Sequence, residues 1–172
     1  MIEARSVHPA GAQRKADRQL LEAFECSAPG APESLREVQR WFRQHALSYE
    51  GARRGSHGHR LMMLFEDGKL VACGSHEHGT IAVDGDDIAT LTLVMGAVSL
   101  SAQGTELSNG RRASRALFDL QVHDGLTQQA AELIVSYVRR DNVKAQTVAA
   151  RHGMTVLRDD GEYLLMVAPV IV

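Results

Sequence analysis

Residues 133–153 read LIVSYVRRDNVKAQTVAARHG, and they say more about the fold than any other part of the chain. Its apolar first part, Leu133–Val138, predicts a buried strand because a short run rich in β-branched residues packs well inside a sheet. Asp141 follows as a capping residue for a helix, and Gly153 ends that helix in the manner of a C-terminal glycine. The stretch therefore predicts a strand that leads directly into a short helix.

Hairpin signals surround this unit on both sides. Downstream, the strands Met154–Leu157 and Tyr163–Val167 flank a polar turn at 158–162. Upstream, Leu61–Phe65 and Leu70–Ser75 flank Asp67-Gly68, a pair that accepts the positive φ angles of a tight turn. Asp84-Gly85 predicts a further turn before a long strand over Ile88–Leu100. A polar loop at 101–110 then precedes a helix predicted over Arg111–Leu126.

The amino-terminal third of the chain shows weaker strand and helix signals than the rest. Residues 1–19 lack a sustained apolar period and predict a flexible tail. Leu20–Cys26 predicts a first strand, and a helix is predicted from Glu33, where apolar residues recur at spacings of three and four. Strands and helices in this order predict one mixed α/β domain over residues 20–172.

The composition excludes several classes of protein. The chain has 172 residues and a formal net charge of −2, which gives no reason to expect nucleic acid or an anionic membrane as a partner. No apolar run approaches the roughly 20 residues that cross a bilayer. Two cysteines, Cys26 and Cys73, are too few for a disulfide framework, and the amino terminus has no apolar signal core, so a cytoplasmic location is expected.

The carboxy-terminal order resembles a known superfamily. A strand, Asn142 at a helix start, Arg151-His152-Gly153-Met154 at its end and a strand with Tyr163 resemble the second half of GNAT proteins, the acetyl-CoA-dependent N-acetyltransferases. The resemblance extends over residues 20–167. It implies an α/β (α+β mixed) domain with a central, mostly antiparallel twisted sheet of six to seven strands, a splayed central strand and about four flanking helices. It also implies acetyl transfer from acetyl-CoA to a primary amine by direct attack in a ternary complex.

The resemblance places the cofactor after the central strand. In the family, backbone N–H groups of the following loop and helix start bind the pyrophosphate of coenzyme A, as helix N-termini generally bind anions. The matching positions here begin at the strand end and continue into the helix: Val98, Leu100, Gln103, Gly104, Gly110, Arg111, Arg112 and Ser114. The family spacing Arg/Gln-x-x-Gly-x-Gly/Ala is not kept, so the loop is lengthened or rebuilt. The plain alternative is an ordinary turn and cap beside solvated arginines.

Catalytic candidates come from the same comparison. Val98 is the expected backbone amide that polarises the acetyl carbonyl, and Asn142 is expected to contact the pantetheine arm or to cap its helix. Glu77 or His76 is the candidate general base at the end of a strand, where a solvated polar strand end is the alternative. The family's usual general acid is a Tyr about seven residues after the Asn, and Ala149 stands there.

The sequence also gives expectations for metal binding and for the oligomeric state. Cys73 lies on the opposite strand face from His76 and His78, so no metal site is expected. Sheet edges of this kind often pair, which makes a homodimer plausible. The rival to an enzyme is a GNAT-like fold that binds acyl-CoA, or a protein partner, without catalysis. The lost Tyr and altered loop favour that rival, whereas the basic helix start favours retention of the ligand.

Overall fold

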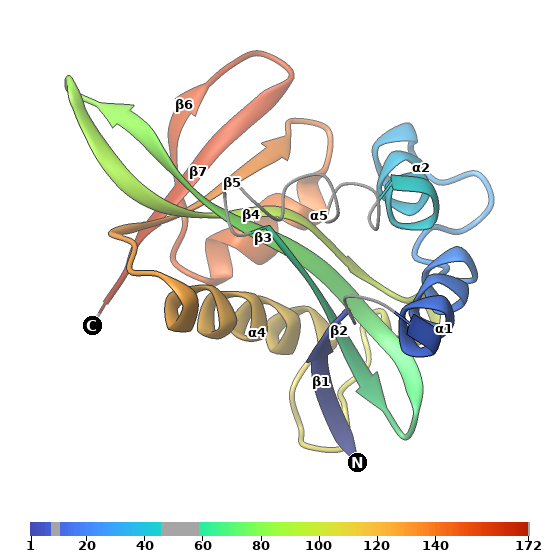
Figure 1. The fold of residues 1–172 in the computed structure, drawn as a ribbon. Coiled ribbons are helices and arrows are strands. Elements are labelled where there is room, and N and C mark those ends of the chain that lie inside the picture. Colours follow the sequence, from blue (N-terminus) through green and yellow to red (C-terminus); the bar gives the residue numbers. More distant parts are fainter. Residues whose placement is uncertain (8–10, 46–58, 172) are drawn as a thin grey trace.

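The computed structural model describes residues 1–7, 11–45 and 59–171. Its centre is a seven-stranded twisted sheet in the order β1-β2-β3-β4-β5-β7-β6 (Figure 1). The strands are β1 (Ile2–Ser6), β2 (Arg60–Glu66), β3 (Lys69–Val83), β4 (Asp86–Val98), β5 (Leu133–Arg139), β6 (Thr155–Asp159) and β7 (Tyr163–Pro169). Neighbouring strands are antiparallel except β4 and β5, which are parallel. The predicted mixed, mostly antiparallel sheet is confirmed.

Helices cover both faces of this sheet. They are α1 (Gly11–Glu22), α2 (Glu33–Arg40), α4 (Ala113–Gln128) and α5 (Val143–Arg151), with a π-helical turn η1 (Trp41–His45) and a 3-10 turn η2 (Leu100–Ala102). The α1–α2 region packs against one face of the sheet through Leu21, Phe24 and Phe42. The other face carries α4 and α5, which share an apolar cluster with β5 and β7 (Figure 1).

Two tight turns set the register of the long strands. Asp67 and Gly68 have φ angles of 48° and 75°, and they join β2 to β3. Asp84 and Gly85, at 52° and 94°, join β3 to β4. Two successive positive φ angles match the right-handed twist of the flanking strands, and Asp-Gly adopts them at low cost. Both predicted turns are confirmed.

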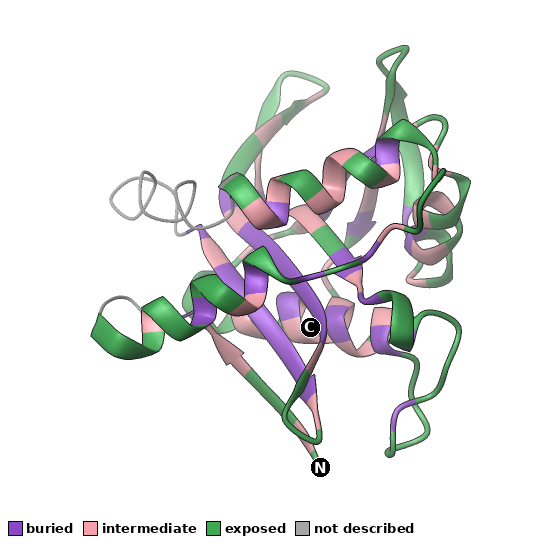
Figure 2. Ribbon diagram, turned by 90° about the vertical axis from the view of Figure 1, so that its right-hand side faces the viewer, coloured by how far each residue is buried: buried purple, intermediate pink, exposed green. Residues whose placement is uncertain are grey.

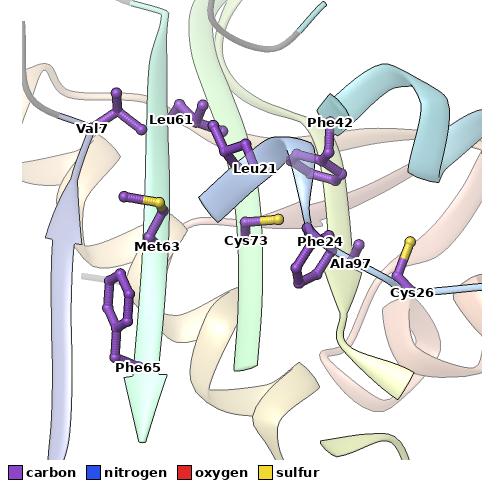
Figure 3. Close-up of a cluster of buried hydrophobic side chains, with 10 residues drawn as sticks. All are labelled: Val7, Leu21, Phe24, Cys26, Phe42, Leu61, Met63, Phe65, Cys73 and Ala97. Carbon is purple, nitrogen blue, oxygen red and sulfur yellow. The ribbon is translucent and has the colours of Figure 1, made fainter. Parts of the chain in front are cut away.

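The core lies between the sheet and its helices. Figure 2 shows buried residues concentrated in the central strands and on the inner sides of the helices. On the α1–α2 face, Met63 and Cys73 from neighbouring strands meet Leu21, Phe24 and Phe42 (Figure 3). Close packing of large apolar side chains on this face is what holds α1 and η1 against the sheet.

The amino-terminal prediction needs correction. Residues 2–6 form β1, which pairs with β2, and residues 11–22 form α1, so the segment read as a flexible tail contributes a strand and a helix. Leu20 and Leu21 are helical rather than the start of a strand. Arg5 binds Asp17 at 2.6 Å between Nη2 and Oδ1, and the Asp17 side chain is fully buried. Charged residues that suggest a solvated tail in sequence thus satisfy each other inside the fold.

Candidate functional site

The central strand separates from its neighbour partway along its length. The parallel pairing of β4 with β5 is confined to Thr90–Thr92 opposite Leu133–Val135. Beyond Thr92, β3 is the one described strand that pairs with β4, which continues to Val98. Pairing with β3 is also interrupted, because Ser75 pairs with Met95 while His76 pairs with Leu93. Val94 is therefore the extra residue of a β-bulge, placed where the two strands begin to splay.

A helix N-terminus lies beyond the end of the splayed strand. The helix α4 begins at Ala113, and its capping residue Arg112 supplies no side-chain hydrogen bond to the first turn. No acidic residue lies in that turn. Gly110, with a φ of 75°, turns the chain just before the helix. The first turn thus presents backbone N–H groups without a capping side chain, which is the arrangement that favours an anion.

A cavity of about 480 Å³ opens at this helix start. One wall is the loop and the first turn of α4, with Gly110, Arg111, Arg112, Ser114 and Arg115. The other wall is the end of α5, with Arg151 and His152. Elements that are distant in sequence meet here because α4 and α5 pack side by side on one face of the sheet. The cavity therefore gathers four arginines next to a helix N-terminus.

The charges of the cavity are only partly neutralised. Arg111 forms an ion pair with Asp119, which lies eight residues later, in α4. No ion pair is found for Arg112, Arg115 or Arg151 with any residue that the structure describes. Arginine presents a rigid fork of donors that matches phosphate oxygens. The cavity is thus suited to a ligand with several phosphate groups.

His152 forms an aromatic part of the same wall. Its ring stacks on Phe118 of α4 with ring centroids 3.7 Å apart and an interplanar angle of 9°. Burial lowers the pKa of His152, and the nearby positive charges of Arg115 and Arg111 lower it further. The imidazole is therefore held in its neutral form in the absence of an anionic ligand.

The predicted cofactor residues fall into two groups. Gly110, Arg111, Arg112 and Ser114 line the cavity together. The earlier part of the loop is instead bound to the α1–α2 connection: the Leu100 N–H donates to Glu25 O at 2.8 Å. Gln103 Nε2 likewise donates to Cys26 O at 2.7 Å and to Val98 O at 3.0 Å. Gly104 adopts a φ of 77° in this rebuilt turn. Internal hydrogen bonds thus occupy Leu100 and Gln103.

Asn142 stands at the junction of β5 and α5. Its Oδ1 accepts a hydrogen bond from Ala145 N at 3.1 Å, which makes Asn142, rather than Asp141, the N-cap of α5. The Asp141 carboxylate instead pairs with Arg139. The cap uses the side-chain oxygen of Asn142, so the amide NH₂ is the part of this side chain suited to donate to a ligand.

The two candidate bases lie on opposite faces of β3. His76 is fully buried under α4, with Nε2 3.2 Å from Asp124 Oδ2, and burial lowers its pKa to about 4. Arg60 also binds Asp124 through two hydrogen bonds. Glu77 is half-buried and shares the opposite face with Cys73, toward α1 and α2. Of the two, Glu77 is the one on the face of the sheet opposite α4.

Four residues of the site escape sequence reasoning. Arg115 is one turn after Arg111, so the i,i+4 spacing could have placed both on one helix face. Arg151 and His152 belong to the family-like end of α5, but nothing local shows that this end meets the start of α4. Val94 and its two neighbours in sequence are apolar residues that also suit a regular strand, so they do not indicate the bulge. Packing between distant elements creates these features.

The described residues contain neither a metal cluster nor a membrane-spanning helix. Within residues 1–7, 11–45 and 59–171, no cluster of three or more His, Cys, Asp or Glu side chains is arranged to hold a metal ion. In the same part of the chain, no helix combines the length and apolar character needed to cross a bilayer.

Comparison with known proteins places the fold. No protein-family model and no curated protein match the sequence. Solved structures do match, among them a mutant of the toxin AtaT bound to the C-terminus of the antitoxin AtaR and acetyl-CoA, with a TM-score of 0.69 and 14% identity over 98% of this chain and 92% of the other. The PaiA N-acetyltransferase of Thermoplasma acidophilum, solved with coenzyme A, matches with a TM-score of 0.68 and 15% sequence identity, and the match covers 99% of both chains. PseH, an N-acetyltransferase of Campylobacter jejuni solved with acetyl-CoA, matches with a TM-score of 0.60 and 10% sequence identity. That match covers 99% of this chain and 100% of PseH. Together with the splayed strand and the helix start beyond it, these matches show that the chain has the GNAT fold.

Proposed function

We propose that this protein is an N-acetyltransferase that moves the acetyl group of acetyl-CoA to a primary amine by direct attack in a ternary complex. The observation that carries the proposal is the arginine-lined cavity at the start of α4. Coenzyme A carries several phosphate charges, and the cavity offers Arg112, Arg115 and Arg151 together with first-turn N–H groups and the Ser114 hydroxyl. Structural neighbours solved with acetyl-CoA or coenzyme A support this choice of ligand.

The splay supplies a path for the rest of the cofactor. Past Thr92, no described strand pairs with the β4 edge that faces β5, and Leu93 O accepts a hydrogen bond there from Ser136 Oγ at 3.3 Å. The backbone groups that follow Leu93 are the partners that we propose for an extended pantetheine arm. Asn142 lies just past the end of β5 and offers its NH₂ group to that arm. We place the amide that polarises the thioester carbonyl at the bulge, at Val94 and Met95, instead of at Val98. The bulge lies where the strands part, whereas Val98 pairs with Ala72 far beyond that point.

The chemistry follows from the groups near the splay. The amine nitrogen attacks the thioester carbon, the carbon–sulfur bond breaks, and the sulfur leaves as coenzyme A thiolate, which takes a proton. Glu77 serves as general base, through water, because it is half-buried and pairs with Thr92, the residue at which the strands begin to splay. A covalent route through cysteine is disfavoured: burial raises the pKa of Cys26 to about 11 and that of Cys73 well above its ordinary value.

Calorimetric titration with acetyl-CoA tests the proposal. We expect the wild type to bind and the double variant Arg112→Ala plus Arg115→Ala to lose at least about tenfold in affinity, because charge-assisted contacts to phosphate contribute about 1.5–3 kcal/mol each. Arg36→Ala plus Arg40→Ala is the matched control, since it removes the same charge from α2, where both arginines pair with Glu33. Equal losses in the two double variants would contradict a site at α4.

The rival function is an acyl-CoA-binding module without turnover. The specific observation in its favour is Ala149, a buried residue where the family usually carries the general-acid Tyr. A screen of primary amines with a thiol-release assay separates the two functions. Release that depends on amine and falls in Glu77→Gln supports the transferase. Binding of acetyl-CoA with no amine-dependent release would favour the module.

A further inference from the structure

We infer that Gln121 is a positioning residue that holds the β4 bulge in the geometry that polarises the acetyl carbonyl. The inference rests on the proposed function and adds to it a residue on α4, beneath the sheet. Gln121 lies near the middle of α4, and its side chain is directed at the sheet rather than at solvent, with only 3% of its surface exposed.

Two hydrogen bonds connect this side chain to the bulge. Gln121 Nε2 donates to Ser75 O at 2.8 Å and to Met95 O at 3.3 Å. These carbonyls belong to the last cross-strand pair before the irregularity, since Ser75 pairs with Met95 and the next pair skips Val94. A buried carbonyl at a disrupted ladder needs another donor, and the side-chain amide of Gln121 supplies it from outside the sheet.

Two glycines of the sheet leave room for the Gln121 side chain. Gly74 and Gly96 face each other across β3 and β4, and both lie against the Gln121 side chain. A Cβ atom at Gly74 would stand 2.7 Å from Gln121 Cδ, a distance that real Cβ contacts do not tolerate. A side chain at this position would therefore force the Gln121 side chain to move away from the strand.

The consequence concerns the direction of backbone donors. A peptide unit is planar, so a hydrogen bond that holds the Met95 carbonyl also fixes the direction of the Gly96 N–H. The same anchor limits rotation of the preceding peptide units, which include the N–H groups of Val94 and Met95 at the splay. Donors fixed in advance stabilise developing charge better than donors that must reorient, so Gln121 preorganises the carbonyl-binding amides from the far side of the sheet.

The test measures the carbonyl directly and needs no acceptor amine. Acetyl-CoA labelled with ¹³C at the acetyl carbonyl is bound to the protein, and its carbonyl stretch is read by difference infrared spectroscopy. We expect binding to the wild type to lower the frequency, as a hydrogen bond to the carbonyl oxygen does. In Gln121→Met the side chain keeps its volume but loses both donations, so the downshift is expected to be lost while the dissociation constant for coenzyme A is unchanged.

Two controls make the result decisive. Leu117→Met changes a buried side chain one turn earlier on the same helix, and it should keep the downshift. Gly74→Ala displaces the Gln121 side chain without altering it and should lose the downshift, which covers the case that Gln121→Met does not fold. A downshift that persists in Gln121→Met, is absent from the wild type–acetyl-CoA complex, or disappears equally in Leu117→Met overturns the inference. Failure of the wild type to bind acetyl-CoA overturns the proposed function itself.

Discussion

At the scale of single residues, His76 shows how the fold decides what a titratable group can do. The sequence places it beside Glu77 as a possible base, yet strand alternation turns it under α4, where Asp124, Arg60 and His78 are its charged and titratable neighbours. Burial is the dominant effect and opposes protonation, whereas the Asp124 carboxylate favours it. A buried neutral imidazole contributes to stability instead of to catalysis.

The contribution of His76 to stability depends on pH. Its pKa is about 4 in the folded protein and 6.5 in the unfolded chain, so the unfolded state binds the proton more readily. The stabilisation is complete above pH 6.5 and is lost as the pH falls through 4; by linkage its size is about 3 kcal/mol. We expect urea unfolding at pH 7, 5 and 4 to show a smaller loss of free energy for His76→Gln than for the wild type.

The exposed His123 on α4 provides the control for that experiment. His123→Gln removes a histidine from the same helix without touching the buried cluster, so its stability should follow that of the wild type at every pH. If His76→Gln and His123→Gln show the same dependence on pH, the buried histidine is not the group that titrates.

His152 should couple ligand binding to protons. Its pKa is lowered in the ligand-free protein by burial and by Arg115 and Arg111. Phosphate groups bound in the cavity add negative charge beside it and raise its pKa, so binding takes up a proton. Acetyl-CoA is therefore expected to bind more tightly as the pH falls through the pKa that His152 has in the complex. Calorimetry in buffers of different ionisation enthalpy measures the uptake directly.

A variant isolates this coupling. His152→Asn keeps a planar polar side chain but cannot titrate, so proton uptake on binding should disappear and the affinity should vary less with pH. The exposed His123→Asn is the matched control and should behave as the wild type. Uptake that survives in His152→Asn would assign the proton to another group.

At the scale of elements, the capping of α5 separates two roles of Asn142. Its oxygen accepts from Ala145 N, and its NH₂ group is the proposed donor to the pantetheine arm. Asn142→Asp keeps an acceptor for the cap but removes the donor, so stability should be retained and acetyl-CoA affinity should fall. Asn142→Ala removes both, and loss of the cap is expected to cost about 1 kcal/mol. Thermal unfolding and calorimetric titration of the two variants measure these effects. Unchanged affinity in Asn142→Asp would leave Asn142 as a cap alone.

Local chemistry determined which elements could be predicted. The turns at Asp67-Gly68 and Asp84-Gly85 need positive φ angles, and few residue pairs supply them, so the hairpins were evident from sequence. The helix α1 cannot be predicted in this way, because its stability comes from Leu21 in the core and from the Arg5–Asp17 ion pair, which joins β1 to α1. Weakly periodic segments are shaped by contacts that only the folded chain provides.

The same division applies to the candidate site at the scale of the whole molecule. The loop and helix start with Gly110, Arg111 and Arg112 were found because they are contiguous in sequence. Arg151 and His152 complete the cavity only because the strand order brings α5 beside α4. The bulge at Val94 likewise depends on the relative registers of β3 and β4. Family resemblance predicts the fold and the ligand, whereas geometry between elements determines which residues meet.

Arg139 connects α2 to the turn between β6 and β7. From β5 it pairs with Glu37 of α2 at 3.1 Å and with Glu162 of the β6–β7 turn at 2.9 Å, and its guanidinium carbon lies 6.0 Å from the centre of the Tyr163 ring. Because its side chain is 24% exposed and holds several partners at once, it should contribute more than an isolated surface pair. We expect Arg139→Gln to lower the free energy of unfolding by more than the loss of a single surface ion pair does.

Hydrogen exchange tests whether Arg139 acts as a link rather than as a local contact. In Arg139→Gln, amides of α2 and of the β6–β7 turn should exchange faster together, although the two segments are far apart in sequence, because one side chain restrains both. Arg158→Gln is the matched control: Arg158 pairs only with Asp160 in the described part of the chain, so its loss should affect that turn alone. Faster exchange in the turn with no change in α2 would show that α2 is held by its apolar packing. Faster exchange in both segments would show that Arg139 restrains α2 and the turn together.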